Sequence, residues 1–150
     1  MKKLALLLFV VLLTSGCSLN TTSVKSDIST GLSKVLTIAT KINNITGTGM
    51  SLFGPIGLAG FCAIQPQDCP AAKAAYTLAV AAQKEYTQIL ADATAANSAA
   101  DGLKLATLAS TIKTHFATIN SLIVASGGKD NSTVITDLSN NITELQNISK

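Results

Sequence analysis

The 150-residue sequence contains no tryptophan and no arginine, and only 13% of its residues are charged and 4% aromatic. All eleven basic residues are lysines. Basic nucleic-acid-binding domains carry clustered lysine and arginine, whereas disordered acidic chains combine few apolar residues with a high net charge. This chain is 47% hydrophobic with a formal net charge of +3. Its composition argues against both classes and indicates a single small domain.

Residues with catalytic or metal-binding chemistry are sparse. The only histidine is His115, and helical spacing places only the hydroxyls of Thr111 and Thr118 near it. A nucleophilic mechanism needs a serine or cysteine at the histidine and an acid that orients it. The eight carboxylates are scattered, without metal-ligand spacing, and there is no phosphate-binding loop. We expect no enzymatic activity, no catalytic residues, no metal, no cofactor and no small-molecule substrate.

The first seventeen residues have the organisation of a secretory signal. Lys2 and Lys3 precede the uninterrupted apolar run of residues 4–13, and small residues then lead to Cys17. Ten helical residues rise about 15 Å, half the hydrocarbon core of a bilayer, so the run is too short to span it. A charged start, a short apolar segment and small residues at its end are typical of a signal peptide.

These residues resemble the signal of bacterial lipoprotein precursors. The resemblance implies cleavage between Gly16 and Cys17, with covalent lipid on Cys17 as a membrane anchor. Ser18, in place of aspartate, implies by analogy the outer membrane, with the domain in the periplasm or outside the cell if the protein is exported further. Without residues 1–16, nine lysines face eight acids and the net charge falls to +1. We therefore expect no nucleic-acid partner.

Cys62 and Cys69 remain as a pair once Cys17 is lipidated. In an oxidising compartment such a pair favours a structural disulfide. Closing this short loop contributes about 2–3 kcal/mol in the chain-entropy model. Free thiols are the first alternative. Redox or metal chemistry is the second, although the chain lacks Cys-x-x-Cys spacing and further ligands nearby.

The remaining chain predicts an all-α domain. We assign residues 1–16 to the signal peptide, 17–26 to the lipidated cysteine and a flexible Ser/Thr-rich tether, and 27–150 to the domain. Apolar residues at helical spacing predict four helices. They run from Asp27 to the glycines at 47 and 49, from 70 to 97, from Asp101-Gly102 to Gly127-Gly128, and from about 132 onward. We expect a small antiparallel bundle with an apolar glycine-rich connection and one short-loop disulfide.

The connection at residues 50–64 is the most unusual segment, since no charged residue lies between Ile42 and Gln67. Its glycines and Pro55 argue against a long regular helix. We favour a buried connection that supplies large apolar side chains to a core otherwise poor in aromatics. The alternative is a loop that inserts into a membrane or binds a partner. The candidate residues are Leu52, Phe53, Ile56, Leu58 and Phe61.

These features together predict a non-enzymatic outer-membrane lipoprotein that binds or scaffolds a component of the cell envelope. Its expected partners are the membrane, through the lipid, and an envelope protein. Two alternatives remain. One is an exclusion or immunity lipoprotein of phage or plasmid type, which blocks a receptor or an injected machine. The other is a membrane-active lysis factor.

Overall fold

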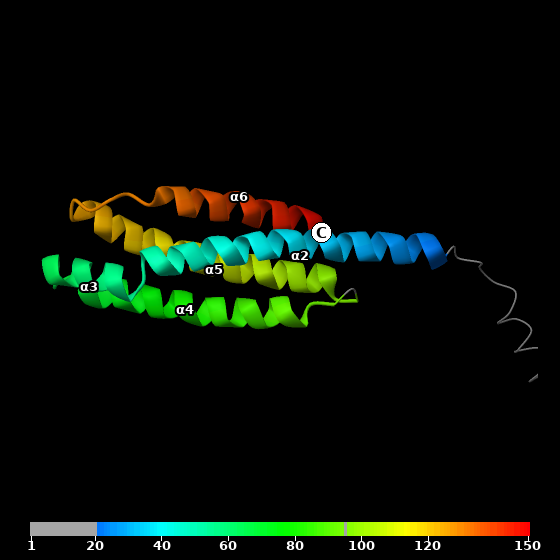
Figure 1. Cartoon of the computed structure of the whole chain (residues 1–150), viewed down its shortest axis with the longest axis horizontal. Helices are drawn as coiled ribbons and strands as arrows, with labels where there is room; N and C mark the ends of the chain where they lie inside the picture. The colour runs from blue at the N-terminus through cyan, green and yellow to red at the C-terminus, as the bar shows by residue number, and fades with distance from the viewer. Residues whose placement is uncertain (1–20, 95) are drawn as a thin grey trace, which may run out of the picture.

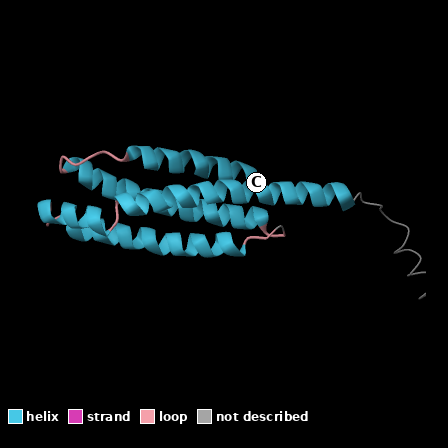
Figure 2. Cartoon of the chain, viewed as in Figure 1, coloured by secondary structure: helices cyan, strands magenta, loops and turns pink. Residues whose placement is uncertain are grey.

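The structure, a computed structural model, describes residues 21–94 and 96–150, with side chains from residue 30 onward. The described part of the chain forms five helices (Figures 1 and 2). They are α2 (Thr21–Leu52), α3 (Pro55–Ile64), α4 (Cys69–Asp92), α5 (Ser98–Ala125) and α6 (Ser132–Ile148). The predicted signal peptide and Cys17 lie outside the described residues.

The four long helices form an antiparallel bundle. Successive long helices run in opposite directions along the molecule (Figure 1). The most extensive packing joins α4 to α5, followed by α5 to α6 and α6 to α2, and α2 also contacts α4 and α5. The predicted all-α bundle of about four helices is therefore confirmed. The short α3 lies at the end of the bundle away from the start of α2, against α4 and the end of α2 (Figure 1).

Alanine allows α4 and α5 to approach each other closely. Ala72, Ala75, Ala79 and Ala82 are buried along one side of α4. Their steps of three and four residues place them on a single helix face. Ala106 and Ala109 are buried on α5. Small side chains bury little apolar area each, so the larger core residues come mainly from α2, α5 and α6.

A buried polar connection links α4 to α2. The Tyr86 hydroxyl donates to the Ala39 carbonyl oxygen at 2.8 Å, and Gln83 Nε2 donates to Asn43 Oδ1 at 2.7 Å. Burial raises the pKa of Tyr86, so its phenol stays protonated and able to donate. Because a slipped helix would leave the buried Tyr86 hydroxyl without its acceptor, the contact favours one register of α4 on α2.

The first helix begins earlier than predicted. It starts at Thr21 rather than Asp27, so residues 21–26 of the predicted flexible tether are helical, and residues 17–20 lie outside the described chain. Threonine and serine are only weakly unfavourable in helices, and no glycine or proline interrupts residues 21–30. Extending an existing helix adds a hydrogen bond for each residue fixed, which offsets this weak propensity.

The end of this helix also differs from the prediction. Gly47 and Gly49 do not end it, because α2 continues to Leu52. Gly49 is buried at a close helix contact, where packing compensates for the poor helix propensity of glycine. The helix stops before Gly54-Pro55. Proline disfavours helical geometry in the preceding residue and lacks an N–H for the helical ladder.

The boundary between α4 and α5 was predicted too late in the chain. The second predicted helix ends at Asp92 rather than 97, and α5 begins at Ser98, so Asp101 and Gly102 lie inside it. A Cβ at Gly102 would overlap Ser149 Oγ, which makes this glycine a packing site rather than a helix break. Because the chain reverses before Ser98, α5 runs back along the side of α4 that carries the buried alanines.

Hydrogen bonds from α5 hold the turn that leads into α6. Asn120 Nδ2 donates to Asp130 Oδ1 at 2.9 Å, and Asn120 Oδ1 accepts from the Asn131 N–H at 2.8 Å. Asp130 also accepts from the Ser132 N–H at 2.8 Å. These bonds, first the one from Asn120, lower the pKa of the Asp130 carboxyl. The charged carboxylate thereby fixes the start of α6 against α5.

Two glycines of α2 should respond in opposite ways to alanine. A Cβ at Gly49 would overlap the buried Phe116 ring, so Gly49→Ala should lower the free energy of unfolding by about 1–3 kcal/mol. Gly47 has open space around it, and Gly47→Ala should raise that free energy by up to about 1 kcal/mol. Urea unfolding followed by circular dichroism measures both. Equal effects would contradict the close contact at Gly49.

The contribution of the turn before α6 to the free energy of unfolding should decrease in acid. Because folding lowers the pKa of Asp130 below its ordinary 3.8, its stabilising contribution is present above that pH and is lost as the pH falls through the folded-state pKa. Asp130→Asn removes this contribution. The stability difference between wild type and variant should therefore be constant near neutral pH and shrink in acid. Urea midpoints measured across that range test this, and a difference independent of pH would contradict it.

Candidate functional site: the exposed face of the short helix α3

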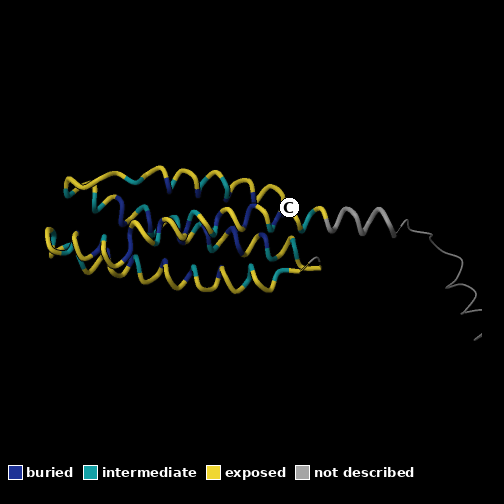
Figure 3. The backbone as a smooth tube through the Cα atoms, in the orientation of Figure 1, coloured by how far each residue is buried: buried dark blue, intermediate teal, exposed yellow. Residues whose placement is uncertain are grey.

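Helix α3 contains no polar side chain. Its sequence is PIGLAGFCAI, and Pro55 occupies the start, where a missing N–H costs nothing. A helix that is apolar on all sides normally lies inside a protein or a membrane. In this structure only one side of α3 is buried (Figure 3). The predicted irregular connection is thus a regular ten-residue helix with an inner and an outer face.

The inner face is attached to the core by large side chains. Phe53, between α2 and α3, is fully buried, and Leu58 and Phe61 are 6% exposed. The rings of Phe53 and Phe116 lie 5.1 Å apart between centroids and are tilted by 44°, a favourable aromatic contact. The absence of a side chain on Gly49 leaves room for the Phe116 ring. Phe53 thus fixes the point from which α3 leaves the bundle.

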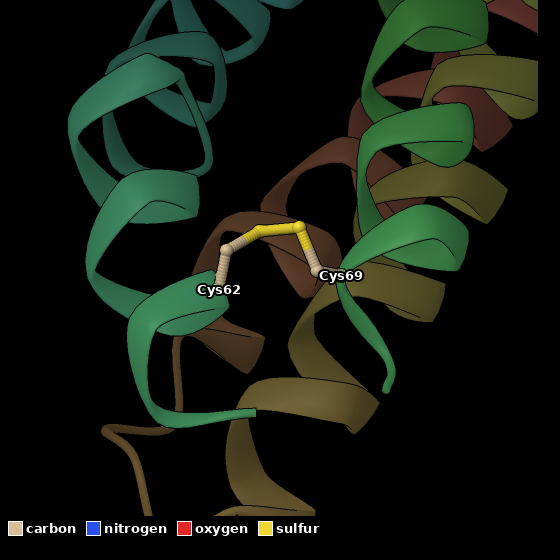
Figure 4. Close-up of a disulfide and its surroundings, with 2 residues drawn as sticks. All are labelled: Cys62 and Cys69. Carbon is tan, nitrogen blue, oxygen red and sulfur yellow. A yellow bond between two sulfur atoms is a disulfide. The ribbon is translucent and has the colours of Figure 1, made fainter. Parts of the chain in front are cut away.

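A disulfide holds the other end of α3. Cys62 in its last turn is bonded to Cys69, the first residue of α4, with Cα atoms 4.8 Å apart (Figure 4). The predicted pairing is confirmed, with six residues enclosed. The connection from α3 to α4 is therefore covalently closed. With Phe53 at its start and this bond near its end, α3 is fixed at both ends.

The outer face is exposed and apolar. Ile56 is 89% exposed and Ile64 is 71% exposed, although isoleucine is normally buried. The α3 face, as we call it, consists of Ile56, Ala59, Gly60, Ala63 and Ile64, all exposed. Its nearest charged neighbours in the sequence are Lys41 and Asp68. This surface offers apolar contact area without a charge or a polar side chain.

The structure divides the predicted candidate residues between core and surface. Phe53, Leu58 and Phe61 are buried, as the favoured interpretation predicted, whereas Leu52 and Ile56 are exposed. For these two the core prediction is wrong, because they lie on the sides of α2 and α3 that face away from the bundle. Ala59, Gly60, Ala63 and Ile64, which complete the exposed side, were not among the predicted candidates. Helical steps of three and four from Ile56 lead to them, but only if a helix is assumed in this segment.

In the part of the chain that the structure describes, His115 and the acidic residues do not form a catalytic or metal-binding cluster. His115 lies part-exposed on α5. The Thr111 and Thr118 hydroxyls donate to backbone carbonyl oxygens one turn earlier, at 3.2 Å and 3.1 Å. Among residues 21–94 and 96–150, no three His, Cys, Asp or Glu side chains gather where a metal ion could bind. Cys17, the predicted lipid site, lies outside the described residues.

Among residues 21–94 and 96–150, one stretch satisfies the length and composition of a membrane span. The helical residues Thr30–Ile64 are long and apolar enough to cross a bilayer. The stretch is interrupted between α2 and α3, however, and Val35, Ile38 and Ile42 on α2 are buried in the bundle. The core helix of a water-soluble bundle has the same properties.

Comparison with known proteins gives no relative, since no family model, no curated protein and no solved structure matches the chain. The function of the α3 face is therefore argued from its own residues. Because its side chains are apolar and uncharged, the arrangement suits contact with another surface rather than bond-making chemistry. Small ligands need placed polar groups for orientation, and none is present on this face.

Substitution by aspartate should lower the free energy of unfolding much more on the buried side of α3 than on the exposed side. Phe53→Asp buries a charge beside Phe116 and should lower the free energy of unfolding by about 3 kcal/mol or more. Ile56→Asp places the same group in solvent and should change it by no more than about 0.5 kcal/mol. Thermal unfolding by circular dichroism compares the two variants. A large loss of stability in Ile56→Asp would contradict the exposed position of that side chain.

Proposed function

We propose that this chain is an outer-membrane lipoprotein that acts without catalysis, by binding and scaffolding a component of the cell envelope through the α3 face. The observation that carries the proposal is the exposed apolar outer surface of a helix that is fixed at both ends. A contiguous apolar surface without charged or polar side chains is characteristic of sites that contact a protein or a membrane. A surface that is already ordered loses little conformational freedom on binding, which favours affinity.

The length of α2 supports a scaffolding role. Its 32 residues rise about 48 Å from Thr21 to Leu52, and α3 follows at the far end. A lipid on Cys17 would be joined to the start of this helix through only a few residues. The proposed anchor and the proposed binding surface therefore lie at opposite ends of one rigid element. Such a protein can hold a partner at a distance set by the bundle.

A membrane-active protein is the second candidate, favoured by the apolar stretch Thr30–Ile64. Insertion of that stretch would withdraw Val35, Ile38 and Ile42 from the core. It would also require the disulfide to follow the helix into the bilayer. Induced expression separates the two candidates, because an inserted helix would cause leakage and loss of viability, whereas a binding protein leaves the cells intact.

The proposed function predicts that the lipid anchor is required for membrane association and the α3 face for binding the envelope component. Wild type should fractionate with the outer membrane and, after cross-linking, co-purify with an envelope component. Cys17→Ala should lose membrane association. Ile56→Asp should remain in the outer membrane and lose the cross-linked component, because a charge would have to be desolvated in the contact.

Leu78→Asp is the matched control, since Leu78 is an exposed apolar residue that belongs to α4 and not to the α3 face. This variant should keep both the location and the cross-linked component. Retention of the component by Ile56→Asp would overturn the binding role of the α3 face. Membrane association of Cys17→Ala would overturn the lipid anchor.

A further inference from the structure

We infer that the disulfide between Cys62 and Cys69 is a redox-sensitive switch for the α3 face. Its reduction by a dithiol, such as the paired thiols of another protein, releases α3 from the bundle while the four long helices stay folded. This switch rests on the proposed function, because it regulates the same surface. It depends on the different ways in which the two ends of α3 are attached.

The attachment before α3 belongs to the bundle. Phe53 continues the hydrogen bonding of α2, since its N–H donates to the Gly49 carbonyl oxygen at 2.9 Å, and its ring contacts Phe116 of α5. The hydrogen bonding of α3 begins one residue later, where the Leu58 N–H donates to the Gly54 carbonyl oxygen at 2.8 Å. Gly54 is therefore the point about which α3 moves while Phe53 remains in the core.

Between its two ends α3 is held by apolar contacts. Leu58 and Phe61 are its buried side chains, and among the described residues no backbone hydrogen bond joins α3 to another helix. An isolated helix needs about 12–15 residues to be stable in water, whereas α3 has ten. Gly57 and Gly60 weaken it further. We therefore expect α3 to keep its helical form only while it is attached to the bundle.

The disulfide supplies the attachment at the other end. It joins the last turn of α3 to the first residue of α4 (Figure 4). Without this bond, the segment between Phe53 and Cys69 gains conformational freedom over its whole length when it leaves the bundle. Only two large buried side chains oppose that gain. Reduction therefore shifts the equilibrium toward release of α3.

A dithiol can reach the bond in the folded protein, because Cys62 and Cys69 are both part-exposed. Exposed disulfides are reduced more readily than buried ones. One thiolate of the dithiol attacks a sulfur of the bond and forms a mixed disulfide, which the second thiolate of the dithiol resolves. Two electrons and two protons pass to the protein as two cysteine thiols, and the dithiol becomes a disulfide.

The contacts that align the long helices do not involve α3. Helix α5 packs between α4 and α6, and α6 packs on α2. The Tyr86 hydroxyl bonds to α2, and Asn120 holds the turn into α6. Reduction therefore acts locally. The α3 face loses its fixed geometry, and a partner must then order the segment again in order to bind it, which lowers affinity.

Hydrogen exchange of the full-length lipidated protein in detergent tests the release. After dithiothreitol, the amides of residues 55–64 should exchange at least about tenfold faster, whereas those of α5 and α6 should keep their rates. Cys62→Ser combined with Cys69→Ser should show the fast exchange of α3 without reductant and should not respond to dithiothreitol. Circular dichroism should show that the bundle remains helical in both cases.

Two results of this experiment would overturn the switch. Unchanged exchange of α3 after reduction would mean that its attachment does not depend on the disulfide. Faster exchange throughout α5 and α6 would mean that the bond stabilises the whole bundle rather than α3 alone.

The rate of reduction tests whether the bond is open to attack in the folded protein. Dithiothreitol should reduce it in native buffer at a rate within about tenfold of that in urea, with the new thiols counted by maleimide mass shift. Reduction in urea alone would overturn the switch, because the bundle would then have to unfold first.

Cross-linking in outer membranes separates this switch from the proposed function. Oxidised wild type should co-purify with its envelope component, and the double serine variant should not. The variant needs no reductant, so the disulfides of other envelope proteins stay intact. Retention of the component by the variant would overturn the regulation and leave binding in place. Absence of the component from oxidised wild type would count against the proposed function, while hydrogen exchange would still report the release of α3.

Discussion

The contact between Phe53 and Phe116 is the constraint on which the presentation of α3 depends. Their ring centroids lie 5.1 Å apart, and the missing side chain of Gly49 leaves room for the Phe116 ring. This contact connects the end of α2 with α5 at the point where the chain turns into α3. The disulfide fixes the opposite end of α3 on α4. A helix without any polar side chain is thereby held with one face in the core and the other in solvent.

The rest of the bundle supports this arrangement through different physical means. The alanine face of α4 permits close packing with α5, but small side chains contribute little apolar burial each. Polar contacts determine how the helices align. The Tyr86 hydroxyl donates to a backbone oxygen of α2, and Asn120 holds the turn into α6. The result is a bundle in which each long helix packs against its neighbours. The apolar α3 face lies at the end of the bundle away from the start of α2 (Figure 1).

The helical pattern of the sequence was sufficient to predict the bundle and the disulfide, but not the α3 face. Steps of three and four residues mark the long helices. The disulfide was favoured because two cysteines remain after Cys17 in a chain expected in an oxidising compartment. Helix ends were less predictable, because tertiary packing carries α2 through Gly49 and turns the chain before Ser98. The glycines and Pro55 of this segment argued against a regular helix, so α3 itself was not predicted. Which side of α3 is exposed depends on where Phe53 enters the core, a long-range contact that no local pattern encodes.

The central claim is that the α3 face is exposed in the isolated bundle and covered in the envelope. The most direct test is the rate of maleimide labelling of Ile56→Cys, measured in the purified protein and in intact outer membranes, with Leu78→Cys as an exposed reference. The account predicts rapid labelling of both cysteines in the purified protein, and protection of Ile56→Cys alone in the membrane. Equally rapid labelling of Ile56→Cys in both settings would contradict it, because the α3 face would then have no partner.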